Sequence, residues 1–234
     1  MDALPDLPPA FGPTRDGLHR LACYVISPAL KARTGRIGLR VTDDGFATPP
    51  FDDGSVIGVS GDRMLTAAGE TPITTLRDAA AFVGVELSPN PDVGTDLPPY
   101  EPDADLGVDD AASRLLARWY GFGDTALARL RVTVPPAGHV TEPQLWPEHF
   151  DLAVVVTLPI ELYVNVGFSP GDDFSSEPYA YVGPHVPAPA NDDPYWNAPF
   201  GAYLSYRDLV AADDPHAAVD RFIGEGLRRV EIGS

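Results

Sequence analysis

Alternating apolar and polar positions predict short strands in the first third of the chain. Apolar residues occupy every second position from Ile37 to Val41, which is typical of a strand with one buried face. Asp43 to Gly45 predicts a turn, and further strands are expected at residues 56–59 and 63–66. Because these strands follow one another through short turns, they predict an antiparallel meander.

Apolar residues at spacings of three and four predict two helices around this meander. The first runs from Asp16 to Arg33, and Pro28 is expected to kink or end it. The second begins at a cap on Thr74 or Thr75 and ends at Gly84, where glycine readily takes the left-handed conformation.

Residues 88–108 are rich in proline and acidic residues, a composition that favours neither a helix nor a central strand. We expect this segment to connect an N-terminal α+β half, residues 1–87, with a C-terminal α+β half, residues 109–234. A chain of 234 residues is equally compatible with one compact domain. The proline-rich residues 1–15 predict an extended arm.

The C-terminal half repeats the mixture of helices and strands. Helices are expected from Asp109 to Gly121, from Asp124 to Arg131, and after the cap and proline of Asp214-Pro215. Strands are expected near residues 151–156, 161–166 and 179–182. The chain as a whole therefore predicts an α+β fold with largely antiparallel sheets and packed helices.

Short motifs recur in the same order in both halves. Arg40-Val41, Gly45-Phe46, Arg77-Asp78 and Phe82 to Gly84 are matched by Asn165-Val166, Gly167-Phe168, Arg207-Asp208 and Phe222 to Gly224. A diverged duplication explains this order, and chance explains it as well because such dipeptides are common. Both interpretations stay open at this point.

Charge and cysteine content narrow the classes of partner. With 34 acidic and 16 basic residues the formal charge is −18, which disfavours nucleic acid and anionic membranes. Cys23 is the single cysteine, so an internal disulfide is excluded and a reducing compartment is expected. Its place on an apolar helix face predicts an inert thiol, although His19 lies one turn away. Residues 1–6 lack a signal peptide and residues 152–168 are short for a membrane span, so we expect a cytoplasmic protein.

Candidate chemistry is densest between residues 146 and 200. On an extended strand, His149 and Asp151 project to the same face, and His185 ends a neighbouring strand. These three are the candidate catalytic residues, and they also form a His/Asp/His set suited to zinc, iron or manganese. The alternative is structural: such residues anchor loops and cap turns. Because known metal and nucleotide motifs are lacking, the cofactor stays open.

A second group of residues is typical of a binding surface. Aromatic side chains beside amides and carboxylates favour ligand contact, and the candidates are Trp146, Glu177, Tyr181, Trp196 and Asn197. The stretch around Trp196 equally predicts a buried loop that plugs one end of a sheet.

Six segments resemble members of an uncharacterised actinobacterial protein family. They are Thr34 to Arg40, Gly45 to Phe51, Leu145 to Ala153, Gly167 to Asp172, Glu177 to His185 and Trp196 to Gly201. The resemblance spans most of the chain and implies a cytosolic bacterial protein. It implies no activity, substrate or cofactor.

Two functions are compatible with these patterns. The first is a module that binds a small molecule or a protein through the loops at 167–177 and 192–200. The alternative is an enzyme, a hydrolase or isomerase, in which a metal or the His149/Asp151 pair performs acid/base work with His185 assisting. We expect the binding module because it requires fewer residues to converge.

Overall fold

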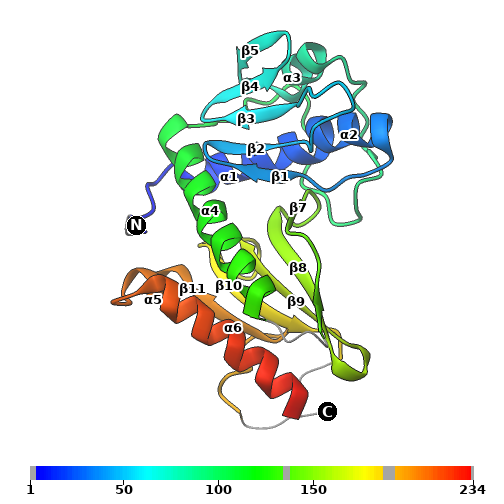
Figure 1. Cartoon of the computed structure of the whole chain (residues 1–234). Coiled ribbons are helices and arrows are strands. Elements are labelled where there is room, and N and C mark those ends of the chain that lie inside the picture. The colour runs from blue at the N-terminus through cyan, green and yellow to red at the C-terminus, as the bar shows by residue number, and fades with distance from the viewer. Residues whose placement is uncertain (1–3, 134–137, 187–192, 233–234) are drawn as a thin grey trace. The chain divides into compact units, whose positions relative to one another are not determined.

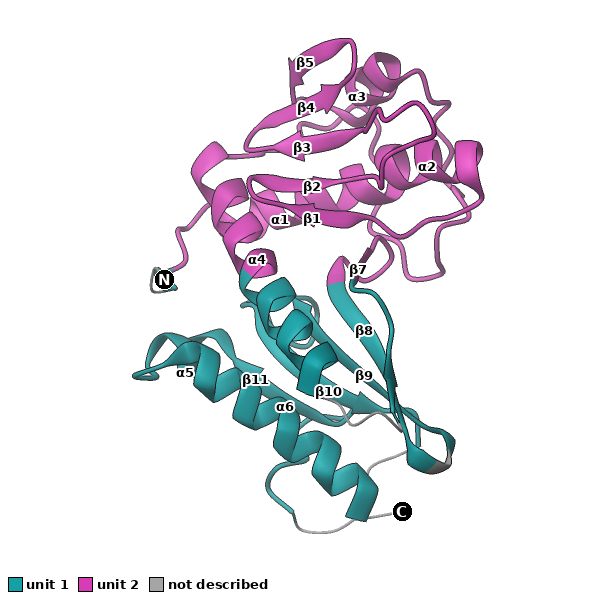
Figure 2. Ribbon diagram, in the orientation of Figure 1, with its two compact units in different colours: residues 1–6, 122–143, 152–234 teal, residues 7–121, 144–151 magenta. Residues whose placement is uncertain are grey.

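The computed structural model describes residues 4–133, 138–186 and 193–232, and its chain divides into two compact units. Unit 1 comprises Met1–Asp6, Phe122–Pro143 and Leu152–Ser234, and unit 2 comprises Leu7–Gly121 and Gln144–Asp151 (Figure 2). Each unit combines helices with an antiparallel sheet, which confirms the predicted α+β class.

Unit 2 contains a five-stranded meander with the order β1-β2-β3-β4-β5 (Figure 1). Its strands are β1 (Arg40–Thr42), β2 (Gly45–Ala47), β3 (Gly58–Ser60), β4 (Arg63–Thr66) and β5 (Gly69–Pro72), and β7 (Gln144–Trp146) also belongs to this unit. Its helices are α1 (Phe11–Leu21), α2 (Ser27–Thr34), α3 (Leu76–Val83) and the first half of α4 (Asp110–Thr133). The antiparallel meander is confirmed, with β2 and β5 as additional strands.

The first helical segment differs from the prediction at both its start and its middle. It begins at Phe11, so residues 11–15 are helical and not part of an extended arm. A π-helical turn, η1 (Ala22–Ile26), interrupts it, and Pro28 lies in the first turn of the helix that follows. Proline is tolerated there because the first turn requires no backbone donor. The prediction for α3 is confirmed, since Thr75 accepts from the Asp78 amide and Gly84 is left-handed.

The proline-rich segment 88–108 lies within unit 2. Val93 and Leu106 are buried, and the Leu106 amide donates to the Thr74 carbonyl at 2.8 Å. Gly17 of α1 lies so close to Leu106 that an added Cβ would be 2.0 Å from its carbonyl oxygen. The segment therefore packs against its own unit, and the expected boundary at 88–108 differs from the division observed.

Unit 1 contains a second antiparallel sheet with the order β11-β10-β9-β8-β6. Its strands are β6 (His139–Val140), β8 (Asp151–Leu158), β9 (Leu162–Ser169), β10 (Tyr179–Pro184) and β11 (Ala202–Ser205), and a 3-10 turn, η2 (Pro159–Glu161), joins β8 to β9. Its other helices are α5 (Tyr206–Val210) and α6 (Pro215–Ile232). The three predicted strands are present in longer form. Asp214 caps α6 as predicted, with its Oδ1 atom 3.0 Å from the Ala217 amide.

A single helix, α4, replaces the two helices predicted at 109–121 and 124–131. Asp109 caps it as expected, accepting from the Ala112 amide at 2.9 Å, but Gly121 does not end it. Gly123 has a packing role within unit 1, because a Cβ there would lie 2.6 Å from the ring of Phe168. This close contact outweighs the low helix propensity of glycine, about 1 kcal/mol.

Helices cover one face of the sheet in unit 1. Most even-numbered residues of β8, β9 and β10 are buried, among them Val154, Val166 and Val182. The helices approach that face at Gly123 and at Gly226, whose added Cβ would lie 2.9 Å from Val182 Cγ1. Because side chains alternate along a strand, the odd-numbered residues project to the opposite face. That face carries Tyr163, Asn165, Gly167, Tyr179, Tyr181 and Tyr203.

The repeated motifs coincide only in part in the structure. A helix follows the last strand of each sheet, and each begins with the same cap: Thr75 with Asp78, and Ser205 with Asp208. The later motifs differ, because Phe82 to Gly84 ends α3 whereas Phe222 to Gly224 lies inside α6.

Among the described residues, no helix combines the length and apolar composition that crossing a membrane requires.

Two glycines of α4 provide a matched test of this packing. We expect Gly123→Ala to lower the free energy of unfolding by about 1–3 kcal/mol, because the new methyl group meets the buried Phe168 ring. Gly121→Ala adds its methyl group where nothing lies within 4 Å, and a gain of about 0.5–1 kcal/mol is expected. Chemical denaturation of both variants measures the difference. Equal stabilities would contradict the proposed contact.

Candidate functional site

His149 lies in a turn, Pro147 to Phe150, and not on the strand that the sequence predicted. Phe150 has a φ of 53°, a left-handed value that is rare for a bulky side chain. The turn leaves His149 exposed, whereas Asp151 begins β8 and is buried. The strand geometry expected to place His149 and Asp151 on one face is therefore wrong.

Side chains from three other segments of unit 2 fix this turn. His19 Nε2 lies 3.0 Å from the carbonyl oxygens of both Pro147 and Glu148. The Cys23 thiol donates to the Pro147 carbonyl at 2.9 Å, and the Tyr120 hydroxyl donates to the Phe150 carbonyl at 2.5 Å. These hydrogen bonds hold the backbone in its unusual conformation.

Ring contacts complete the anchoring of Phe150. Its ring stacks on that of His19 with centroids 5.2 Å apart and meets Phe46 and Tyr120 edge to face. Glu148 adds a tie to residues 95 and 96, since its Oε1 atom accepts from the Thr95 amide at 2.6 Å. That hydrogen bond is the main cause of a lowered pKa for Glu148. Trp146, at the end of β7, and His149 in the turn are exposed, while the rest of the turn packs into unit 2.

Cys23 and His19 are structural in this arrangement. Cys23 is fully buried, and burial raises the pKa of its thiol far above the ordinary value. Burial lowers the pKa of His19, while its Nε2 atom already faces two carbonyl oxygens. A nucleophilic pair needs a thiolate and a free base, so the contacts support the inert thiol.

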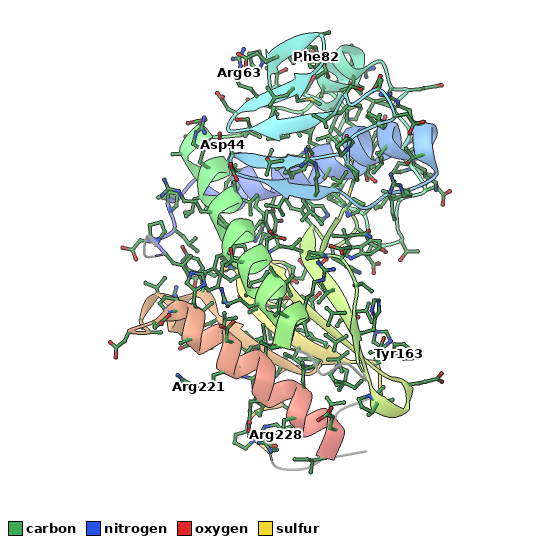
Figure 3. The ribbon with its side chains drawn as sticks, in the orientation of Figure 1. Asp44, Arg63, Phe82, Tyr163, Arg221 and Arg228 are labelled. Carbon is green, nitrogen blue, oxygen red and sulfur yellow. The ribbon has the colours of Figure 1, made fainter. Side chains whose placement is uncertain are left out.

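His185 belongs to the sheet face of unit 1 that α4 and α6 leave uncovered. It follows β10 and is exposed, with Nε2 2.9 Å from Asn165 Oδ1 and its ring 5.8 Å from that of Tyr163. Figure 3 shows Tyr163 near the hairpin of β8 and β9. Within the described ranges, which include His149, Asp151 and His185, no three His, Cys, Asp or Glu side chains are grouped to hold a metal ion.

The ring of Tyr181 lies over the neighbouring strand β9 on this face. Its cross-strand partner in β9 is Gly167, and a Cβ on Gly167 would lie 2.5–2.7 Å from the hydroxyl and ring atoms of Tyr181. The missing side chain therefore lets the tyrosine ring lie over the neighbouring strand. On the other side, Tyr181 pairs with Tyr203 of β11.

Five rings gather here into an aromatic cluster, which consists of Phe174, Tyr179, Tyr181, Phe200 and Tyr203. Phe174 stands edge to face with Phe200 and with Tyr203, with centroids 5.0 Å apart in both pairs. Tyr179 stacks on Phe200 at 6.1 Å, and Tyr181 meets Phe200 edge to face at the same distance. Tyr179 is buried beneath the others, whereas Phe174 and Phe200 are 41% and 37% exposed.

The loop that carries Phe174 is held in place by Asp172. Its Oδ1 atom accepts from the amides of Phe174 and Ser175, and its Oδ2 atom accepts from the Tyr179 hydroxyl at 2.6 Å. The exposed phenylalanine is thus tied to the same tyrosine that supports it from below.

The other predicted ligand-binding residues of unit 1 have structural partners. Glu177 pairs with Arg207, accepting from its Nε at 2.8 Å. The Asn197 side chain accepts from the Tyr203 amide and donates to the Tyr203 carbonyl, so it satisfies the outer edge of β11. Trp196 packs edge to face on Tyr195, whose hydroxyl donates to the Phe222 carbonyl in α6. Residue 192 of the predicted loop lies outside the described residues.

Tyr181 was a predicted ligand-binding residue, and Phe174 and Phe200 lie in the two loops that the sequence predicted to bind, whereas Tyr179 and Tyr203 were not predicted. Tyr179 and Tyr181 are two positions apart on a strand, and this spacing predicts that their side chains lie on the same face of the sheet. The position of Tyr203 depends on the β10–β11 register, and Phe174 and Phe200 reach the face from loops.

No protein-family model, curated protein or solved structure matches the chain.

The turn in unit 2 generates a pH prediction. Because the pKa of His19 is lowered in the folded state, the unfolded chain takes up its proton first as the pH falls below about 6.5. We expect stability to fall between pH 7.5 and 5.5 by up to about 1.4 kcal/mol per pH unit from this group.

The matched variant is His19→Gln, which keeps a nitrogen donor but does not titrate. Its denaturation midpoint should change less over the same pH range. His216, whose pKa burial also lowers, titrates in both proteins and cancels from the comparison. Identical pH dependence of the two proteins would show that His19 is not held neutral.

Proposed function

We propose that the chain is a binding module whose site is the aromatic cluster of unit 1 and whose ligand is a protein segment. The observation that carries this proposal is the gathering of five rings on the sheet face that α4 and α6 leave uncovered, with Phe174 and Phe200 more than one-third exposed. Exposed apolar patches of this kind mark interaction sites.

The composition of the face supports a protein ligand. Cores of protein interfaces are enriched in tyrosine and phenylalanine and depleted in charged residues. The strands of this sheet contain no lysine or arginine. Tyrosine also combines a large apolar ring with a hydroxyl, so it contacts both the side chains and the backbone of a partner.

The rigidity of the cluster supports the same proposal. Its rings pack against one another with centroids 5.0–6.3 Å apart, and Asp172 ties the Phe174 loop to Tyr179. A surface that is already ordered loses little conformational entropy when it binds. Because the rings touch each other, they form a continuous surface, which suits an extended segment or a shallow protein face.

A peptide display selection tests the proposal directly, because the library itself supplies the candidate ligands. We expect peptides selected on the wild-type protein to bind Phe174→Ser and Phe200→Ser at least about fivefold more weakly, since truncation of an interface aromatic typically costs about 1–3 kcal/mol.

The matched control is Val210→Ser in α5, because Val210 is 38% exposed and lies outside the cluster. It should bind the selected peptides as the wild-type protein does. Thermal melting checks that all three variants fold. Selected peptides that bind the wild type and both phenylalanine variants equally would refute a site at the cluster.

A further inference from the structure

We infer that the segment recognised by the aromatic cluster is basic and presents arginine side chains to it. This inference rests on the proposed function of the same face and specifies the chemistry of its partner. Both the distribution of charge around the cluster and the properties of the rings themselves support a basic partner.

The border of the cluster carries an excess of negative charge. The loop between β9 and β10 holds Asp172, Asp173 and Glu177 and no basic residue. Arg207 of α5 forms an ion pair with Glu177 of this loop, so each neutralises the other. Asp172 and Asp173 are exposed beside Phe174, so the most exposed ring of the cluster stands next to two carboxylates.

The other arginines described in unit 1 lie on α4 and α6. Arg129, Arg131, Arg228 and Arg229 form ion pairs with Asp220, Glu142, Glu225 and Asp193, respectively. Arg221 also belongs to α6, as Figure 3 shows. These helices pack on the even-numbered face of the sheet, so their cations do not offset the acidic border of the tyrosine face.

The rings favour the same kind of ligand. The face of an aromatic ring attracts a cation, and arginine is the best suited side chain because its planar guanidinium stacks on the ring and is weakly hydrated. The exposed Asp173 carboxylate beside Phe174 adds a bidentate acceptor for the same group. An acidic or phosphorylated segment would instead be repelled by Asp172, Asp173 and the overall charge of −18.

Three nine-residue peptides that alternate glycine with arginine, lysine or glutamine test the inference by fluorescence or calorimetric titration of the full chain. We expect the arginine peptide to bind at least about tenfold more tightly than the glutamine peptide and more tightly than the lysine peptide. Phe174→Ser should weaken the arginine peptide about tenfold. Asp173→Asn should weaken it about threefold and reduce its salt dependence, whereas the exposed control Asp213→Asn should not.

The outcomes separate this inference from the proposed function. Equal binding of all three peptides, lost in Phe174→Ser, would overturn the basic partner and retain the binding face. Equal binding of the arginine and lysine peptides, unaffected by Phe174→Ser, would show attraction by acidic charge alone and overturn the inference. If none of the peptides binds, the inference is also overturned, and the display selection decides the proposed function independently.

Discussion

Close packing of α4 and α6 against one face of the sheet in unit 1 determines what the other face can do. Gly123 and Gly226 permit that packing, because a Cβ would collide with Phe168 at Gly123 and with Tyr195 and Val182 at Gly226. The aliphatic residues of the even-numbered face are thereby buried. The antiparallel registers then align Tyr181 with Gly167 on one side and Tyr203 on the other, on the face that these helices do not cover. The aromatic cluster follows from this division of the sheet into a buried face and a tyrosine face.

In unit 2, the stretch that resembles a catalytic site in the sequence is a turn held by contacts from other segments. The stretch Trp146 to Asp151 concentrates histidine, carboxylates and aromatics, but its backbone is fixed by His19, Cys23 and Tyr120. Those contacts stabilise a left-handed Phe150, which would cost about 1–3 kcal/mol if the surroundings did not impose it. The backbone carbonyls of this stretch and the Glu148 carboxylate therefore serve to hold a turn. In unit 1, Asn197 has a comparable role, because its amide completes the edge of β11.

Sequence patterns predicted the features that depend on neighbouring residues. The caps at Thr75, Asp109 and Asp214 and the meander of unit 2 are of this kind. The length of α4 was missed because the partner of Gly123 is Phe168, which lies in β9, the fourth strand after α4 along the chain. The loops that carry Phe174 and Phe200 were expected to bind, but the contacts of these rings with Tyr179 and Tyr203 were not predicted, because no periodicity encodes the course of a loop. His149 was misplaced because the contacts that impose a positive φ on Phe150 come from distant segments.

The central claim is that the tyrosine face of unit 1 is the binding surface. NMR of the protein with isotope-labelled tyrosine and phenylalanine rings, recorded during titration with a display-selected peptide, tests it most directly. The account predicts that ring signals of Phe174, Tyr181, Phe200 and Tyr203 shift together and saturate at one peptide per chain. Signals of Tyr24 and Tyr120, which are buried in unit 2, should stay unchanged. Shifts confined to rings of unit 2, with the cluster unaffected, would contradict the account.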